Sequence, residues 1–415
     1  MIIEIPNNNI FERKYIIDIL FNEFLGLEYS IEIGSENYEI ILSNQKKFII
    51  KDSFFNKYPK DLEYLKLKNI PKSIKELDIF SASFFMLTRW EEYVNKNRDN
   101  HNRFSAYESL AYKEGFLDRP IVNEIVEDLK SKLLELDSSL VFKKREFELV
   151  LTHDVDVPLL HYDFIHHIKA SILDIIRRKD IKLFIDRNIE YFKVKFLSKQ
   201  DAFDTFDYLM NTSEKYDTKS YFFFMAKGTS IYDNMYKSNN RVIQNIIKKI
   251  KTRGHYIGIH PTYNAYNDIE QFKKEKIELE NNLNSNIKFG REHYLRFEVP
   301  TTWQIWEDNK MKWDSTLSYA DKEGFRCGVC YEYSTFNILT REKLNLKEKP
   351  LIVMDTSFIS YQLDINPNEM ESKIINLIGK VKKYNGEFVF LWHNSSFNTK
   401  EWEKYQNIYK RVLER

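Results

Sequence analysis

Short apolar runs alternate with helical patterns over most of the second part of the chain. The runs cover residues 147–152, 220–225, 256–260 and 387–392, and the helical patterns cover about 203–216, 239–252, 267–284 and 368–383. Continuous apolar runs of this length are typical of strands in a parallel sheet, which is buried on both faces. The pattern predicts an α/β fold, either a (β/α) barrel or an open doubly wound sheet. In both folds the active face lies at the carboxyl ends of the strands.

The first part of the chain shows a mixed pattern. Helical patterns and short alternating runs lie at about 11–25, 38–42, 47–51, 78–87 and 120–134. The last helical pattern opens with Pro120 in its first turn, a position that proline favours. We predict a small α+β domain of unknown role over residues 1–145, followed by a second domain over residues 146–415.

A helical and basic stretch interrupts the second domain at about residues 158–200. Its cationic residues are Lys169, Arg177, Arg178, Lys179, Lys182, Arg187, Lys193 and Lys195. One interpretation is a solvated helical insertion that rests an apolar face on the barrel. The other is a lid, or a surface that faces anionic carriers and makes peripheral contact with a membrane.

The overall charge is balanced, with 63 Lys and Arg against 62 Asp and Glu, so we expect no nucleic-acid partner. Cys327 and Cys330 are too few to cross-link 415 residues, which favours a reducing compartment, and their CxxC spacing lacks a second pair. No segment approaches ~20 uninterrupted apolar residues. We expect a cytoplasmic protein without a transmembrane segment, and the sequence does not indicate its oligomeric state.

Two aspartates close the first apolar run of the second domain. In Thr152-His-Asp-Val-Asp156, the alternation of a strand places Asp154 and Asp156 on one side and His153 on the other. Two carboxylates that face the same mouth repel each other unless a cation or a proton relieves the repulsion. The motif favours a metal site, and the alternative is a helix-capping aspartate beside a loop aspartate.

Other residues with suitable chemistry also lie at predicted strand ends. His260 ends the third apolar run, whereas His255 faces the opposite side of that strand. His393 follows the last run and could face Asp154 as an acid faces a base. Arg296 could hold a carboxylate base ionised and oriented. A single histidine or arginine of this kind more often has a structural role. We consider these residues together because all of them lie at the same predicted edge of the sheet.

The order of these motifs resembles the polysaccharide deacetylases of carbohydrate esterase family 4 over about residues 148–395. The motifs are the aspartate pair, Gly254-His-Tyr-Ile-Gly-Ile-His260, Arg296 ahead of a proline, and Leu391-Trp-His393. The resemblance implies a distorted (β/α) barrel that uses one divalent metal ion to remove N- or O-acetyl groups from sugars. Residues 80–93 and 319–330 resemble a bacterial subgroup associated with surface-polysaccharide biosynthesis.

The resemblance also implies roles for individual residues. Asp154 corresponds to the base that activates the attacking water, and His393 corresponds to the acid that protonates the leaving group. Asp156 and His260 correspond to metal ligands.

Three further assignments follow from the same resemblance. Arg296 corresponds to the arginine that tunes the base, and Asp321 to the carboxylate paired with the acid. The second ligand histidine of the family, expected four residues after His260, is Asn264 in this chain. We therefore expect the third metal ligand to be Asn264 or a water molecule, since an amide oxygen binds zinc or cobalt less well than imidazole does.

These expectations describe a metal-dependent hydrolase that removes acetyl groups from an acetylated sugar or a polysaccharide precursor. Zinc is the first choice of metal, with cobalt or nickel as alternatives. Asn264 motivates a different hypothesis, a metal-free and catalytically inactive protein that binds glycans or joins a biosynthetic complex. A third hypothesis is that the same site hydrolyses another acyl or amide bond.

Overall fold

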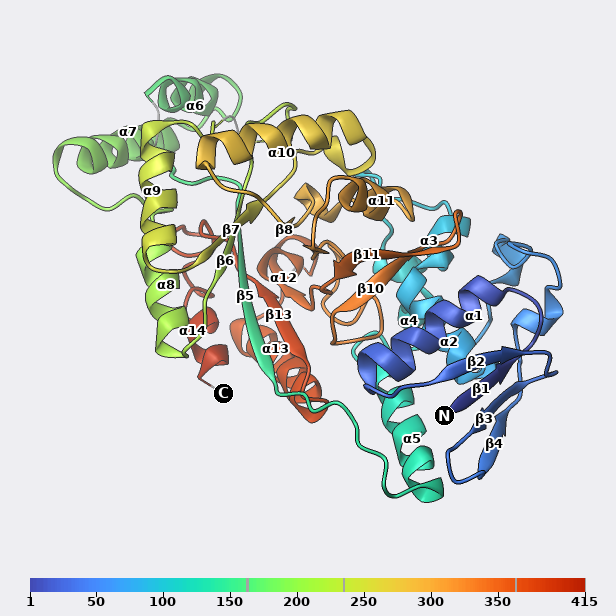
Figure 1. The fold of residues 1–415 in the computed structure, drawn as a ribbon. Coiled ribbons are helices and arrows are strands. Elements are labelled where there is room, and N and C mark those ends of the chain that lie inside the picture. Colours follow the sequence, from blue (N-terminus) through green and yellow to red (C-terminus); the bar gives the residue numbers. More distant parts are fainter. Residues whose placement is uncertain (162–163, 234–235, 363, 415) are drawn as a thin grey trace.

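A computed structural model describes residues 1–161, 164–233, 236–362 and 364–414 (Figure 1). Two sheets organise these residues. A four-stranded sheet lies near the amino terminus, and a nine-stranded sheet runs through the rest of the chain. The α/β fold with a preceding α+β part that the sequence predicts is confirmed.

The large sheet has the strand order β10-β11-β9-β8-β7-β6-β5-β13-β12. All neighbouring strands pair in parallel except β10 and β11. The strands are β5 (Glu148–Val155), β6 (Tyr221–Phe224), β7 (Tyr256–Ile259), β8 (Phe289–Gly290), β9 (Trp313–Asp314), β10 (Tyr333–Asn337), β11 (Glu342–Glu348), β12 (Val353–Met354) and β13 (Glu387–Leu391). No pairing joins the end strands β10 and β12 within the described ranges, so the predicted barrel is open between them.

Helices connect the parallel strands, as the alternating pattern predicts. They are α8 (Phe206–Lys215), α9 (Arg241–Thr252), α10 (Ile269–Leu283), α11 (Thr301–Asp308), α12 (Asp355–Tyr361) and α13 (Pro367–Lys383), and a further helix, α14 (Ile408–Leu413), follows the last strand. Local sequence explains where several begin. Asp268 caps α10 by accepting from the backbone N–H groups of Glu270 and Gln271, and Asn366 caps α13 ahead of Pro367.

The smaller sheet has the order β2-β1-β3-β4, in which β1 and β2 are parallel and the other pairs are antiparallel. Its strands are β1 (Ile2–Ile5), β2 (Ser30–Ile33), β3 (Tyr38–Ile41) and β4 (Lys47–Ile50). The helices of this part are α1 (Ile10–Ile17), α2 (Ile79–Thr88), α3 (Trp90–Val94), α4 (Leu110–Lys113) and α5 (Ile121–Leu136). The helical pattern predicted from residue 11 to 25 is α1 continued by a π-helical segment, Asp18–Phe24.

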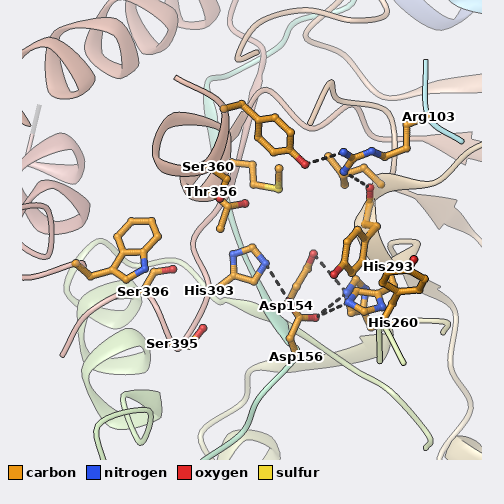
Figure 2. A pocket seen from close by; sticks show the side chains of 16 residues that line it. Arg103, Asp154, Asp156, His260, His293, Thr356, Ser360, His393, Ser395 and Ser396 are labelled. Atoms are coloured by element: carbon orange, nitrogen blue, oxygen red, sulfur yellow. Dashed lines mark hydrogen bonds and ion pairs between the residues drawn. The ribbon is translucent and has the colours of Figure 1, made fainter. Parts of the chain in front are cut away.

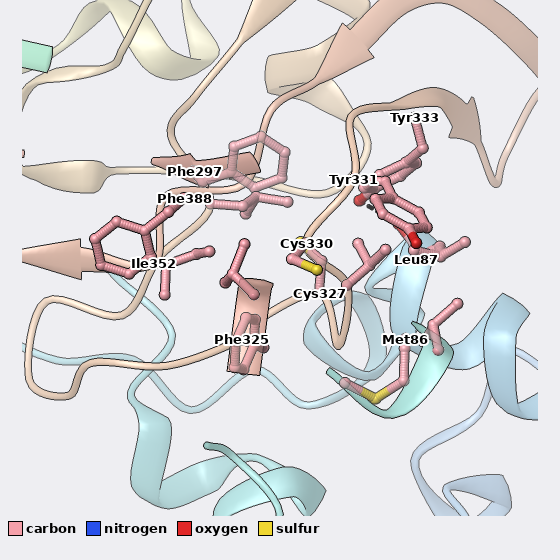
Figure 3. Packing of buried hydrophobic residues seen from close by; sticks show 14 of the residues in the cluster. Met86, Leu87, Phe297, Phe325, Cys327, Cys330, Tyr331, Tyr333, Ile352 and Phe388 are labelled. Carbon is pink, nitrogen blue, oxygen red and sulfur yellow. Dashed lines mark hydrogen bonds between the residues drawn. The ribbon is translucent and has the colours of Figure 1, made fainter. Parts of the chain in front are cut away.

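The two parts share one hydrophobic core (Figure 3). Met86 and Leu87 of α2 pack near Cys327 and Cys330, and the Tyr333 hydroxyl donates to the Leu87 carbonyl at 2.9 Å. Both cysteines are free thiols, and burial raises the pKa of Cys327 to about 12. The CxxC pair is therefore part of the core.

The predicted insertion forms a helical hairpin of α6 (Phe164–Ile176) and α7 (Ile181–Phe196). Figure 1 shows the hairpin at the edge of the molecule beyond α9, on the side away from the four-stranded sheet. None of the helices that the structure describes is both long enough and apolar enough to cross a membrane.

Candidate metal centre and active site

Five side chains from four strand ends meet in one pocket (Figure 2). Asp154 lies near the end of β5 and Asp156 just after it, and His260, His293 and His393 follow β7, β8 and β13. These strands are parallel, so their carboxyl ends reach the same edge of the sheet. The pocket has a volume of about 310 Å³, and all five side chains line it.

Asp156, His260 and His293 form a group that could hold a metal ion. One ligand atom of each lies within 4.8 Å of the others. The Oδ1 atom of Asp156 is 3.2 Å from His260 Nε2 and 3.5 Å from His293 Nε2. Asp156 Oδ1 and His260 Nε2 are buried without a hydrogen-bond partner among the described residues. Because buried polar atoms are rarely left unpaired, this donor set of one carboxylate and two imidazoles fits a divalent ion such as zinc.

Hydrogen bonds to the far ring nitrogens orient both histidines. His260 Nδ1–H donates to the Arg291 carbonyl at 2.6 Å, and His293 Nδ1–H donates to Asp233 Oδ1 at 2.9 Å. Burial would raise the pKa of Asp233, but His293 and backbone N–H donors outweigh this and hold its pKa well below the usual range. Such outer contacts fix the tautomer that leaves Nε2 available to a metal.

Asp154 is held by an arginine other than the predicted one. Arg291 Nη1 donates to Asp154 Oδ1 at 2.8 Å and to the Thr152 hydroxyl at 3.0 Å, and its Nε donates to the Ser315 carbonyl at 2.8 Å. Both Arg291 and Asp154 are buried. A buried guanidinium that donates a hydrogen bond to a carboxylate fixes the carboxylate in place.

Arg296, which was predicted to tune the base, lies away from Asp154. Its guanidinium stacks between Tyr263 and Tyr266, and it donates to the backbone carbonyls of His101 and Tyr263. It makes no described contact with Asp154. The chain turns sharply between the two arginines, where Tyr294 and Leu295 have φ angles of 61° and 55°. This left-handed turn sends Arg296 away from the strand edge that Arg291 occupies.

His393 is bonded to a buried carboxylate at the start of α12. Its backbone N–H donates to Asp355 Oδ2 at 2.8 Å, and its Nδ1–H donates to Asp355 Oδ1 at 2.7 Å. His393 Nε2 lies 3.6 Å from Asp156 Oδ2. Burial would lower the pKa of His393, but Asp355 and the two site aspartates outweigh it and raise the pKa to about 10. The ring is thus held as a proton donor facing the pocket.

Asp321, to which the sequence assigned the pairing with His393, does not reach it. Its carboxylate accepts from the Ser105 hydroxyl and from the Ala106 backbone N–H instead. Asp355 instead forms the predicted pair with His393. Asp321 therefore joins the segment between β9 and β10 to the N-terminal part, outside the pocket.

Asn264 is also absent from the pocket in the described structure. It is exposed and precedes a short 3-10 turn, whereas His293 supplies the third donor near Asp156 and His260. Sequence reasoning missed His293 because β8 has only two residues and gives no periodic signal. The signal in the sequence that could have identified His293 was its position shortly after the Phe289–Gly290 segment.

The alternation predicted for the strand ends holds for the neighbouring histidines. His153 points away from the pocket, with Nδ1–H donating to the Trp392 carbonyl at 2.7 Å. Burial lowers its pKa to about 4. His255 contacts Glu214 through Nε2 at 3.2 Å, also outside the pocket.

The N-terminal part contributes one arginine to the pocket. Arg103 lines it, donates to the Tyr294 carbonyl at 3.1 Å and to the Tyr361 hydroxyl at 2.6 Å, and pairs with Asp99 at 2.7 Å. No sequence motif singles out this residue. The site is therefore built by both parts of the chain.

Comparison with known proteins gives matches of two kinds. Residues 1–138 match the model of a family of unknown function (DUF7033). Among curated proteins, no sequence matches the chain. A solved structure from Mycobacterium smegmatis, described as a polysaccharide deacetylase, is similar with 12% identity and a TM-score of 0.42, over 66% of this chain and 84% of its own. A mutant of a CE4 family pseudoenzyme with restored enzymatic activity is similar with 11% identity and a TM-score of 0.31, over 65% of this chain and 63% of its own.

Proposed function

We propose that this protein is a metal-dependent hydrolase that removes acetyl groups from an acetylated sugar or a glycan precursor, in surface-glycan biosynthesis. The observation that carries the proposal is the group Asp156, His260 and His293, with Asp154 and His393 beside it in one pocket. A metal site flanked by a carboxylate base and an imidazole acid is suited to hydrolysis of an acyl bond.

The residues divide the proton transfers between them. Asp156, His260 and His293 would hold a divalent ion, and that ion would supply a Lewis acid for the acetyl carbonyl. Asp154, held in place by Arg291, takes a proton from the attacking water. His393 donates the proton on Nε2 to the departing nitrogen or oxygen, while Asp355 holds the opposite side of its ring. Acetate and the free amine or hydroxyl are the products.

The lining of the pocket favours a sugar. Four hydroxyl residues and a tryptophan also line the pocket, namely Thr356, Ser360, Ser395, Ser396 and Trp402. Hydroxyls can bond sugar hydroxyls, and an aromatic ring can pack on the apolar face of a sugar ring. A volume of about 310 Å³ is at the small end of ligand sites, which favours a single sugar unit inside the pocket.

Acetate release tests the proposal. The full chain is stripped with a chelator, reloaded with zinc, cobalt or nickel, and incubated with acetylated amino sugars in free, nucleotide-linked and polymeric form. We expect acetate to appear only with metal and with at least one of these substrates. Metal-loaded protein that releases no acetate from any of them, or equal release without metal, would overturn the proposal.

The hypothesis of a metal-free protein arose from Asn264. His293 offers a third possible ligand beside Asp156 and His260, so the metal site does not depend on Asn264. Elemental analysis of protein purified without chelators distinguishes the two: we expect stoichiometric metal that is lost in His260→Ala.

A further inference from the structure

The α6–α7 hairpin buries polar side chains and exposes apolar ones. On the inner side of α6, His167, Ser171 and Asp174 are almost completely buried. His167 Nε2–H donates to Asn188 Oδ1 at 3.1 Å, and Arg187 Nε donates to Asp174 Oδ2 at 2.5 Å. These bonds join α6 to α7 through a polar layer. The insertion therefore does not rest an apolar face on the sheet, which was one interpretation of its sequence.

The outer sides of both helices carry stripes of isoleucine. Ile168, Ile172 and Ile176 recur every four residues on α6, and Ile181, Ile185 and Ile189 do so on α7. Each of these side chains is between 40% and 69% exposed. A helix on a protein in water normally turns its apolar stripe inward, so both helices are inverted relative to that rule. Contiguous exposed apolar surface of this kind marks a contact site.

The hairpin is also the basic part of the chain. Residues 164–199 contain nine Lys and Arg against four Asp and Glu, whereas the remaining residues contain 54 against 58. Arg177, Arg178 and Lys179 form the turn between the helices and are exposed. The rest of the molecule thus has a net negative charge, and the hairpin offers a local attraction to anionic surfaces.

We propose that the α6–α7 hairpin is a membrane-docking element that lies in the headgroup region of an anionic bilayer. Apolar stripes combined with basic side chains are the composition of helices that bind membrane interfaces. Polar residues that pair with one another inside a helical pair, with apolar residues outside, are the arrangement found in lipid. The helices have 13 and 16 residues, about 20 and 24 Å at 1.5 Å per residue. Both are shorter than the ~30 Å hydrocarbon core, so the hairpin lies on the membrane.

The base of the hairpin is fastened close to the pocket. The backbone N–H groups of Leu160 and His161 donate to the Asp201 carboxylate at 2.9 and 2.8 Å, which ties the two ends of the insertion together. Asp156 lies only a few residues before this point. No residue of the hairpin is among the described residues that line the pocket, which argues against a lid. Docking would hold the pocket near the bilayer surface, and the proposal does not depend on the chemistry in the pocket.

Vesicle co-sedimentation of the full chain tests this proposal. We expect binding to phosphatidylcholine vesicles that contain phosphatidylglycerol, and weaker binding when the anionic lipid is absent or the salt concentration is high. The affinity of the double variant Ile172→Asp/Ile185→Asp for these vesicles should fall by roughly tenfold or more, because two charges would enter the membrane interface. Ile277→Asp, on α10 and equally exposed, is the matched control and should bind like the wild type.

Three results would overturn the proposal. The first is the absence of binding to anionic vesicles, and the second is equal binding by the double variant, whose fold is checked by circular dichroism. The third is a wild-type protein that forms dimers, becomes monomeric in the double variant and stays in the supernatant when the vesicles sediment. In that case a second copy of the chain covers the isoleucine stripes.

Discussion

Each of the two candidate ligand histidines, His260 and His293, is oriented by a hydrogen bond from the ring nitrogen that faces away from the pocket. His260 donates to a backbone carbonyl, whereas His293 donates to the carboxylate of Asp233. A carboxylate partner makes an imidazole more basic and a stronger ligand. We therefore expect His293 to contribute a large share of the metal affinity, although it lies in a short turn.

Replacement of His293 tests this ligand assignment. In His293→Ala, we expect metal affinity to fall by two or more orders of magnitude, because one of three protein ligands is lost. Asn264→Ala is the matched comparison and should retain stoichiometric metal, since Asn264 is exposed. Elemental analysis and competition with a chromophoric chelator measure both. If Asn264→Ala lost the metal and His293→Ala retained it, the third ligand would be Asn264 and not His293.

Replacement of Asp154 tests the base. Asp154→Asn keeps the size of the side chain and its contact with Arg291 but removes the proton acceptor. We expect turnover to fall by about two orders of magnitude or more, with metal content and thermal stability close to those of the wild type. Acetate release under saturating metal measures this effect. Turnover equal to that of the wild type would exclude Asp154 as the base.

At the scale of elements, glycines bring the ligand-bearing strands together. A Cβ atom on Gly290 would lie 1.9 Å from the Ile259 carbonyl oxygen, and one on Gly258 would lie 2.6 Å from the Phe289 carbonyl oxygen. The two glycines allow β7 and β8 to approach closely. Because His260 and His293 follow these strands, the spacing of the strands sets the spacing of the ligands.

Gly290→Ala is expected to damage both stability and metal binding. The added methyl group must displace the β7 backbone, at a cost of about 1–3 kcal/mol in the free energy of unfolding. Gly379→Ala on α13 is the control, because nothing lies within 4 Å of its Cβ position. This control should gain about 0.5–1 kcal/mol from helix propensity. Urea unfolding and metal titration of both variants measure these effects. Unchanged metal affinity in Gly290→Ala would show that the spacing of the two strands does not set the spacing of the ligands.

At the scale of the whole molecule, a buried group of charges joins the N-terminal part to the segment between β9 and β10, which contains Arg326. Glu92 of α3 accepts from Arg326 at 2.5 and 3.0 Å and from Arg89 at 2.8 Å. The two guanidinium groups lower the pKa of Glu92 to about 2 against the opposing effect of burial. Glu91 lies beside them, 3.6 Å from Arg89, and burial raises its pKa to about 7.

The raised pKa of Glu91 makes stability depend on pH. The folded state binds a proton on Glu91 more tightly than the unfolded state does. This contribution to stability is therefore complete below the unfolded pKa of 4.5 and is lost as the pH rises through about 7. In Glu91→Gln, we expect the drop in unfolding free energy between pH 5 and pH 8 to be smaller by roughly 2 kcal/mol. Urea unfolding at both pH values measures it. Glu403→Gln, at an exposed position, should keep the wild-type dependence.

From the sequence alone, it was possible to predict the residues of the candidate site that lie at the ends of the longer apolar runs. Asp154, Asp156, His260 and His393 stand at or next to the ends of apolar runs of at least five residues, where period-two alternation and parallel pairing place side chains on one edge. The α/β fold and the helical insertion follow from the same periodic patterns. These features depend on residues that are close together in the chain.

Only the tertiary structure decided which partners complete the site. His293 and Asp355 follow strands of two residues, β8 and β12, which are too short for any periodic signal. The selection of Arg291 rather than Arg296 depends on a left-handed turn between two identical residue types. In each case the deciding contact joins segments far apart in the chain, and it depends on strand order and backbone direction that local patterns do not encode. The inverted hairpin shows the same limit, because periodicity reveals an apolar stripe but not whether it faces the protein or its surroundings.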